Sequence, residues 1–326
     1  MTGYKYAVLL LLTMFMGCQT TTDKERPAPS IDIRTGSDRP ELFGKNIIST
    51  SLPERDVAIH PQGKELIYTV GDYKNKKMCL VVVRKVNGDW GKPGIMPISG
   101  KYRDLEPFYS HNGDRLFFVS NRPVFNDNTR NDYNIWFSNR TANGWSEPEA
   151  LDSVVNTRGH EFYPSLSEKG NLFYTARRAD GIGGEDIFMS EFREGRFQAP
   201  EPLPEAVNTE FDEFNAYVSP GEDLIVFSSY GRPDDSGRAD LYISRKDAAG
   251  KWTPAKNMGP LVNSDQLDYC PFIDWENRNF YFTSERAAAE NSGIENIDSL
   301  KQAAHSILNG FGNIYKISLD ALEQTE

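Results

Sequence analysis

Five acidic residues recur along the chain at nearly constant spacing, and they are the first candidates for chemistry. Successive members are separated by 50, 57, 52 and 55 positions, and the set is Glu54, Asp104, Glu161, Glu213 and Asp268. If these carboxylates meet in space, they could bind a cation, a sugar or a basic partner. A pair held roughly 5 to 9 Å apart, with the pKa of one raised, could instead hydrolyse a glycosidic bond.

Arginines follow most of these carboxylates after one further strand-like segment. That segment ends in a serine or alanine and then an arginine in three units, which supplies Arg122, Arg177 with its neighbour Arg178, and Arg286. The fourth unit places its arginine later, at Arg232. A carboxylate paired with an arginine on the neighbouring strand needs no ligand to explain it. We therefore favour a structural latch inside each unit, with a binding site as the alternative interpretation.

Other catalytic and metal-binding patterns are weak. Of four histidines, only His160 lies beside a member of the acidic set, and it joins the candidate site. The sequence contains no G-x-S-x-G nucleophile motif and no Cys or His spacing typical of a metal site. The segments around Asp127, Asp132, Asp234 and Asp235 do not follow a calcium-loop pattern, and such clusters usually form turns. We predict neither a metal nor a cofactor.

Each acidic residue opens a unit of four short strand-like segments. A Gly or Asn turn follows the first segment, and the second is a continuous apolar run such as LFF or LIVF. Such runs, bounded by turns, are typical of strands buried on both faces. A third apolar segment leads through a Gly and Pro turn to a fourth, which ends in VNT or VNS in three units. Four-stranded units repeated around an axis form a β-propeller, so we predict an all-β fold with five blades of four antiparallel strands.

The two ends of the chain are expected to close the ring. The fifth unit stops near Leu319 without a fourth strand, and residues 43–50 resemble the VNT segments. We predict that residues 41–50 complete the last blade, so that the propeller spans residues 41–326 and has no open sheet edge at the seam.

A long insert follows Ser284 in the fifth unit. Its apolar residues recur at helical spacing, which predicts a helix within about residues 290–310. We favour a helix docked on its own blade. The alternatives are a helix that covers the channel mouth and one that presents an apolar stripe to a partner.

The N-terminal sequence predicts that the protein is exported. A lysine precedes an apolar run at residues 7–16 that is too short to span a membrane stably, so residues 1–17 are predicted to be a secretory signal peptide. The FMGC sequence at its end resembles a lipobox, which implies lipidation of Cys18, with a plain cleaved signal as the alternative. Residues 18–40 are polar and contain prolines, as in a flexible tether. We expect a cell-envelope protein anchored by lipid to the outer membrane, with Cys79 and Cys270 as free thiols.

The second unit carries a family resemblance. Its sequence RDLEPFYSHNGDRLFFVSNR, residues 103–122, resembles the TolB-type, WD-like propeller repeat through Asp104, Pro107, Ser110, Gly113, Ser120 and Arg122. The acidic stretch near Asp23 also resembles the surface-export signals of some Bacteroidetes lipoproteins. The repeat resemblance implies a propeller over residues 51 to about 320. It implies no particular activity, because this fold hosts unrelated functions.

The net charge and the predicted topology limit the classes of ligand and the position of the candidate site. The formal net charge is −11, which argues against nucleic acid or an anionic membrane surface as a ligand, so the lipid is the expected membrane contact. The segments that enter the first strands share one face of a propeller with the second-to-third loops, and the acidic set, the arginines and His160 are expected at the channel mouth on that face. We expect a monomeric, non-catalytic module that binds an envelope protein or glycan there. The alternatives are a glycan-active enzyme that uses the channel-mouth carboxylates and a periplasmic assembly scaffold, and the protein could be periplasmic or surface-exposed.

Overall fold

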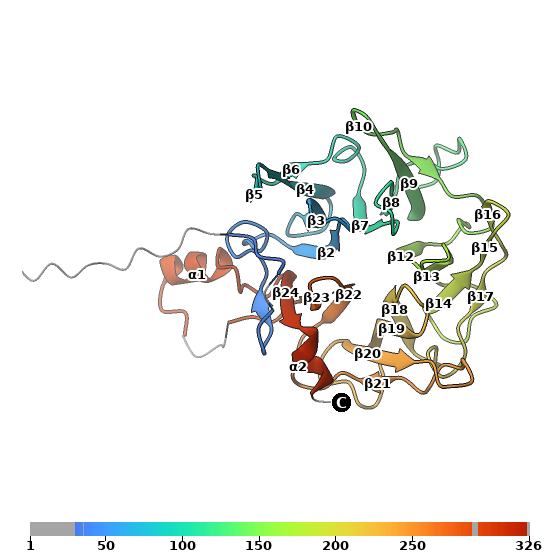
Figure 1. Ribbon diagram of the computed structural model, residues 1–326. Coiled ribbons are helices and arrows are strands. Elements are labelled where there is room, and N and C mark those ends of the chain that lie inside the picture. The colour runs from blue at the N-terminus through green and yellow to red at the C-terminus, as the bar shows by residue number, and fades with distance from the viewer. Residues whose placement is uncertain (1–29, 35, 289–292, 325–326) are drawn as a thin grey trace, which may run out of the picture.

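Five antiparallel sheets stand around a common axis, each with its innermost strand nearest the centre (Figure 1). The computed structural model describes residues 30–34, 36–288 and 293–324. The prediction of an all-β propeller with five blades is confirmed. The innermost strands of blades one to five are β2 (Glu54–Ile59), β7 (Asp104–Tyr109), β12 (Glu161–Leu166), β18 (Asp212–Val218) and β22 (Asp268–Asp274).

Each blade adds three strands outward from its innermost strand. The second strands are the apolar runs of the sequence, and they are β3 (Glu65–Gly71), β8 (Arg115–Ser120), β13 (Leu172–Ala176), β19 (Leu224–Tyr230) and β23 (Asn279–Ser284). The third strands are β4 (Met78–Val86), β9 (Asn134–Thr141), β14 (Asp186–Ser190), β20 (Asp240–Arg245) and β24 (Asn313–Ser318). The outermost strands are short, and they are β6 (Gly94–Ile95), β11 (Glu149–Ala150), β17 (Glu201–Pro202), β21 (Lys256–Asn257) and β1 (Glu41–Leu42).

Tight hairpins extend three of the blades at their outer rim. In blades one and two, β5 (Asp89–Trp90) and β10 (Gly144–Trp145) pair with the far ends of the third strands. In blade three, β15 (Phe192–Arg193) pairs with β16 (Arg196–Phe197).

Strand β1, from the N-terminal part of the chain, closes the ring, as the sequence predicts. Strand β1 lies antiparallel to β24, with Leu42 opposite Tyr315, and so supplies the fourth strand of blade five. The amide of Phe43 donates to the carbonyl of Ile314 at 2.9 Å and extends the pairing by one bond. The regular strand is shorter than the predicted segment, because the chain turns back after Phe43 and buries Ile48 completely.

The residues just before β1 also belong to the folded ring. Ile31 and Ile33 are buried against blades one and five, and the Asn279 side chain donates to the Ile33 carbonyl at 2.8 Å. The Lys316 ammonium group donates to the Asp32 carbonyl at 2.9 Å. The described part of the predicted tether is therefore packed on the propeller. The predicted signal peptide, Cys18 and residues 19–29 lie outside the described residues.

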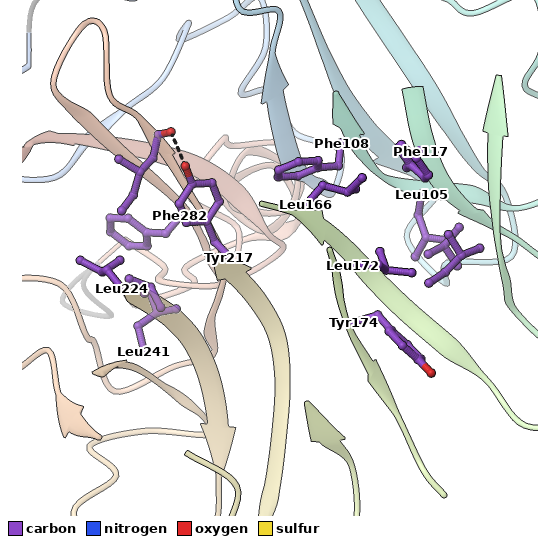
Figure 2. Close-up of a cluster of buried hydrophobic side chains, with 14 of the residues drawn as sticks. Leu105, Phe108, Phe117, Leu166, Leu172, Tyr174, Tyr217, Leu224, Leu241 and Phe282 are labelled. Atoms are coloured by element: carbon purple, nitrogen blue, oxygen red, sulfur yellow. Dashed lines mark hydrogen bonds between the residues drawn. The ribbon is translucent and has the colours of Figure 1, made fainter. Parts of the chain in front are cut away.

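Hydrophobic side chains of neighbouring blades fill the space between the sheets (Figure 2). Leu105 and Phe117 of blade two lie in the same cluster as Leu172 and Tyr174 of blade three. The cluster continues through blades four and five, where Tyr217, Leu224, Leu241 and Phe282 are its labelled members. Because these side chains come from both faces of each sheet, the second strands had to be apolar without alternation.

The asparagine of the VNT and VNS segments ties each fourth segment to the third strand of the same blade. Asn208 accepts from the Ile187 amide at 2.9 Å and donates to the carbonyls of Ile187 and Leu203, both at 2.9 Å. Asn156 and Asn263 make equivalent bonds in blades two and four. All three amides are buried, and a buried amide is stable only with its partners in place. The VNT and VNS motif recurs because its asparagine joins the fourth segment of each blade to the third strand.

The insert of blade five forms the predicted helix, but the helix is not docked. Helix α1 (Ile297–Ala304) begins at Asn296, whose side chain accepts from the amides of Asp298 and Ser299, and none of its residues is buried. Figure 1 places α1 beside the outer edge of the ring and not over the centre. The expectation of packing on blade five is wrong, because Ile297 and Leu300 are 62% and 47% exposed.

The remaining helix is short. Helix α2 (Leu319–Glu323) ends the described chain and buries Leu319. Among the described residues, no helix is both long enough and apolar enough to cross a membrane.

Candidate functional site

The repeated carboxylates are buried at the joints between blades. Each is at most 1% exposed, and each accepts a hydrogen bond from a hydroxyl group in the segment that leads into its strand. Serine supplies this hydroxyl to the two aspartates and threonine supplies it to the three glutamates, and the pairs are Thr50 with Glu54, Ser99 with Asp104, Thr157 with Glu161, Thr209 with Glu213, and Ser264 with Asp268. The carboxylates therefore join the end of one unit to the start of the next.

Arginines complete this joint in three blades. Arg122 contacts Asp104 at 2.7 Å, and Arg232 and Arg286 contact Glu213 and Asp268 at 2.9 Å. Each guanidinium also donates to a backbone carbonyl of the segment that leaves the preceding blade, and these carbonyls belong to Ile98, Val207 and Val262. The predicted latch thus reaches across the junction between two blades, as well as between strands of one blade.

Blade three departs from this pattern. Arg177 has a side chain that is 72% exposed and pairs with Asp212 of blade four at 3.6 Å, so it does not reach Glu161. Its neighbour Arg178 takes the inner position instead, stacked over the Phe188 ring at 5.4 Å. Of the two arginines that the sequence offers here, Arg177 points outward and Arg178 lies inward, and neither forms an ion pair with Glu161 among the described residues.

Glu54 and Glu161 are held by threonine, and no arginine ion pair to either occurs among the described residues. Burial raises the pKa of Glu54 to about 7, although bonds from the Thr50 hydroxyl and amide partly oppose the shift. Burial likewise raises the pKa of Glu161. Both carboxylates are enclosed, at 1% and 0% exposure, so a dissolved substrate cannot reach them. The geometry therefore gives the repeated acidic set a structural role.

A second ring of residues, two positions further along each innermost strand, occupies the centre. Each of these residues lies within a β-bulge and has a left-handed backbone, with φ between 51° and 58°, and they are Asp56, Glu106, Tyr163, Asn215 and Cys270. A left-handed conformation is costly for a residue other than glycine, so the surrounding sheet must enforce it. Sequence reasoning missed this ring, because its five members differ in type.

The central ring is a closed polar cluster around one cation. Arg55 contacts Asp56 and Glu106, both at 2.7 Å, and its guanidinium lies 4.9 Å from the centre of the Tyr269 ring. Glu106 also accepts from the Tyr163 amide at 2.6 Å. Burial raises the pKa of Glu106 to about 7, and Arg55 partly opposes the shift. Loss of any one partner would leave a buried charge uncompensated, so these three charged side chains depend on one another at the axis.

An open pocket lies beside this cluster on the upper face, defined here as the face with the segments entering the first strands and the second-to-third loops. Its volume is about 350 Å³, and its lining residues are Glu185, Asp212, Phe214, Tyr230, Arg238, Ala239 and Leu267. Tyr230 is 56% exposed, so its ring is offered to solvent. Phe214 and Leu267 also pack against Tyr269 and Cys270, which places the pocket next to the channel mouth.

Charges of both signs surround the aromatic rings of this upper pocket. Asp212 accepts from the Glu185 amide at 2.8 Å and faces Arg177 at 3.6 Å. Arg238 pairs with Glu285 at 2.7 Å. Burial and the nearby Asp212 carboxylate raise the pKa of Glu185. Arg177, one of the predicted site residues, contacts the lining residue Asp212 but does not itself line the pocket.

His160 lies on the upper face in a separate aromatic group. Its Nδ1 accepts from the Tyr133 amide at 3.0 Å, and its ring lies 5.7 Å from the rings of both Tyr133 and Phe162. The Arg103 guanidinium stacks over Tyr133 at 5.0 Å. This group extends the aromatic surface around the channel mouth, and His160 is exposed within it.

The described residues contain no group of three His, Cys, Asp or Glu side chains placed to hold a metal ion. The aspartates of the polar loops have local partners instead. Asp127 accepts from the amide and hydroxyl of Thr129, and Asp234 and Asp235 each accept from the Tyr242 hydroxyl at 2.8 Å. Cys79 and Cys270 are both free thiols, and Cys270 is buried in the central cluster.

Comparison with known proteins finds similar folds among solved structures but no match in sequence. No protein-family profile matches this sequence, and no curated protein matches it. Among solved structures, one described as a glycoside hydrolase has 10% identity and a TM-score of 0.50, covering 89% of this chain and 90% of its own. TolB from Acinetobacter baumannii has 11% identity and a TM-score of 0.47, and a putative TolB from Agrobacterium tumefaciens has 13% and 0.47.

Coverage differs between the two TolB structures. The matches cover 85% and 81% of this chain, but they cover 58% of the Acinetobacter protein and 90% of the Agrobacterium protein. This chain therefore spans less than two thirds of the Acinetobacter TolB. At these identities the likeness concerns the fold alone.

Proposed function

We propose that this protein is a non-catalytic binding module of the cell envelope that holds a protein or glycan partner on its upper face. The observation that carries the proposal is the contrast between its two sets of carboxylates. The repeated set is buried and bonded within the scaffold, whereas Glu185 and Asp212 line an open pocket beside Tyr230. Rigid scaffolds that carry variable loops commonly present their binding residues in this way.

The composition of the upper pocket favours recognition of a polar ligand with an apolar face. Phe214 and Tyr230 supply flat aromatic surface, and Arg238 and Asp212 supply charges that fix orientation. A few convergent polar groups around aromatic walls are typical of ligand pockets. The envelope location is part of the proposal and depends on the predicted signal peptide and on lipidation of Cys18.

A glycan-active enzyme is the second candidate, and one observation favours it. Glu185 has a raised pKa and lies against Asp212 in an accessible pocket, which gives two carboxyl groups with different environments. Such a pair is a candidate acid and base. The enzyme would then use this pair and not the buried repeated set.

The decisive experiment compares binding and turnover in the same preparations. The full chain would be screened on a glycan array and in envelope-protein pulldowns, alongside Tyr230→Ala and a Lys169→Ala control on the opposite face. The proposal predicts a saturable partner whose affinity falls about tenfold in Tyr230→Ala and is unchanged in the control. If the protein instead hydrolyses a bound glycan, and Glu185→Gln and Asp212→Asn abolish that hydrolysis, the binding-module proposal is rejected in favour of the glycan-active enzyme.

A separate measurement tests the envelope location. Expression of the full chain in a Gram-negative host with a radiolabelled fatty acid should label the protein, and Cys18→Ser should remove the label. Cys79→Ser is the matched control and should leave the labelling intact. Equal labelling of all three proteins, or of none, would contradict the lipid anchor.

A further inference from the structure

A second pocket opens at the other end of the central channel, on the lower face, which carries the turns between first and second strands. Its volume is about 230 Å³. Five Phe, Tyr and Trp residues from three different blades line it, and they are Phe108, Tyr109, Tyr217, Phe272 and Trp275. This lower pocket lies at the opposite end of the innermost strands from the central cluster, so it is distinct from the upper pocket.

The aromatic rings are held at inclined angles, as in a box. The rings of Tyr217 and Phe272 lie 5.6 Å apart at 77°, and those of Phe108 and Tyr217 lie 6.3 Å apart at 49°. Hydrogen bonds fix the arrangement. The Tyr217 hydroxyl donates to the Ile273 carbonyl at 3.1 Å (Figure 2), and it accepts from the Trp275 indole N–H at 2.9 Å.

The hydrogen bonds of Tyr217 and Trp275 determine which surfaces of the pocket remain free to contact a ligand. The indole N–H of Trp275 is already engaged, so the surface that this ring offers is its π system, whereas Tyr217, at 4% exposure, serves to hold that ring in place. Trp275 is nevertheless 39% exposed, which is unusual for so large an apolar side chain. An aromatic face that is open to solvent and fixed in orientation is a site for a cation or a flat apolar group.

The charges of the pocket favour a cation. Asp274 and Glu276 flank Trp275 and line the pocket, and Glu276 is exposed. Its lining residues, all within the described chain, include neither lysine nor arginine. Burial, together with Lys64, lowers the pKa of His60 to about 4, so this imidazole is uncharged near neutral pH. His111 is engaged through Nε2, which donates to the Leu166 carbonyl at 3.0 Å.

We propose that the lower pocket is a binding site for a small organic ammonium ion, with a quaternary ammonium group inside the aromatic box and Glu276 at its rim. Cation–π contacts with the exposed Trp275 and the half-buried Phe272 supply the attraction, and the exposed Glu276 carboxylate supplies selectivity for positive charge. The pocket is too small for a folded domain and suits one compact head group. This inference is independent of any partner on the upper face.

The test uses choline as the probe and its uncharged isostere, in which carbon replaces the ammonium nitrogen, as the matched ligand. Ligand-observed NMR on the full chain would follow the methyl protons of both compounds. Because one cation–π contact changes affinity by about 2- to 30-fold, choline should bind about tenfold more tightly than the isostere. Trp275→Ala should weaken choline about tenfold, and Trp275→Phe should weaken it less.

Two further variants separate this site from a general loss of folding and from the upper pocket. Glu276→Gln changes one exposed side chain and should weaken choline about two- to threefold while leaving the isostere unchanged. Tyr230→Ala should leave choline binding unchanged. Equal affinity for the two ligands, no saturable binding of choline, preference for a neutral sugar such as methyl glucoside, or full binding by Trp275→Ala would each overturn the proposal.

Discussion

Replacing Glu54 by glutamine should stabilise the protein at alkaline pH, because this buried carboxylate has no arginine partner among the described residues. Burial raises its pKa from 4.5 to about 7. The folded chain therefore holds the proton more tightly than the unfolded chain does. Stability from this group is fully present below about pH 4.5, falls as the pH rises, and is lost above about pH 7.

The size of the effect follows from the shift. A rise in pKa from 4.5 to about 7 corresponds to about 3 kcal/mol of unfolding free energy. Glutamine is uncharged and keeps both bonds to Thr50, since its oxygen can accept from the amide and its NH₂ group can donate to the hydroxyl. Glu54→Gln should therefore raise the free energy of unfolding by up to about 3 kcal/mol at about pH 8 and by little at about pH 5.

Asp104 supplies the matched control from the same structural position. It pairs with Arg122 at 2.7 Å, and Arg122 is 9% exposed. Asp104→Asn leaves that buried cation without its partner and should cost about 3 kcal/mol at about pH 8. Urea unfolding followed by circular dichroism measures both variants. If Glu54→Gln lost as much stability as Asp104→Asn at about pH 8, the reasoning about the missing arginine would be refuted.

Three other perturbations test the scaffold. Arg55→Met removes the cation of the central cluster and should lower the free energy of unfolding by about 3 kcal/mol or more at about pH 8. The loss should be smaller at about pH 5, because protonation of Glu106 removes a buried negative charge. Urea unfolding at both pH values measures the difference. Asn208→Ala should cost about 2 kcal/mol of unfolding free energy, whereas Asn143→Ala in an exposed turn should cost almost nothing. Burial raises the pKa of the Cys270 thiol, so a thiol reagent should modify it only after urea unfolds the chain, as peptide mapping would reveal.

The fold was predictable because the repeat carries most of the information. Acidic residues, turn glycines and apolar runs recur in register, so the number of blades and the closing strand could be inferred before any contact was known. The VNT and VNS segments were recognisable as a motif. Their physical purpose, a buried amide such as Asn208 between third and fourth segments, required the hydrogen bonds.

The candidate site was less predictable, for three physical reasons. The central ring varies in type from Asp56 to Cys270, and only its shared left-handed backbone identifies it. The sequence offers Arg177 and Arg178 side by side, and the choice between them depends on which one can stack on Phe188. Helical spacing in the insert predicts an apolar stripe, but it does not reveal whether another surface lies opposite Ile297.

Site-directed photocrosslinking tests the central functional claim most directly. A photoreactive residue at position 230 probes the upper pocket, and one at position 169 probes the opposite face, each in the full chain within intact cells. The binding-module proposal predicts a discrete adduct from position 230 that disappears when Asp212→Asn is added, and no such adduct from position 169. Adducts of equal yield from both positions, or from position 169 alone, would contradict the assignment of the upper face.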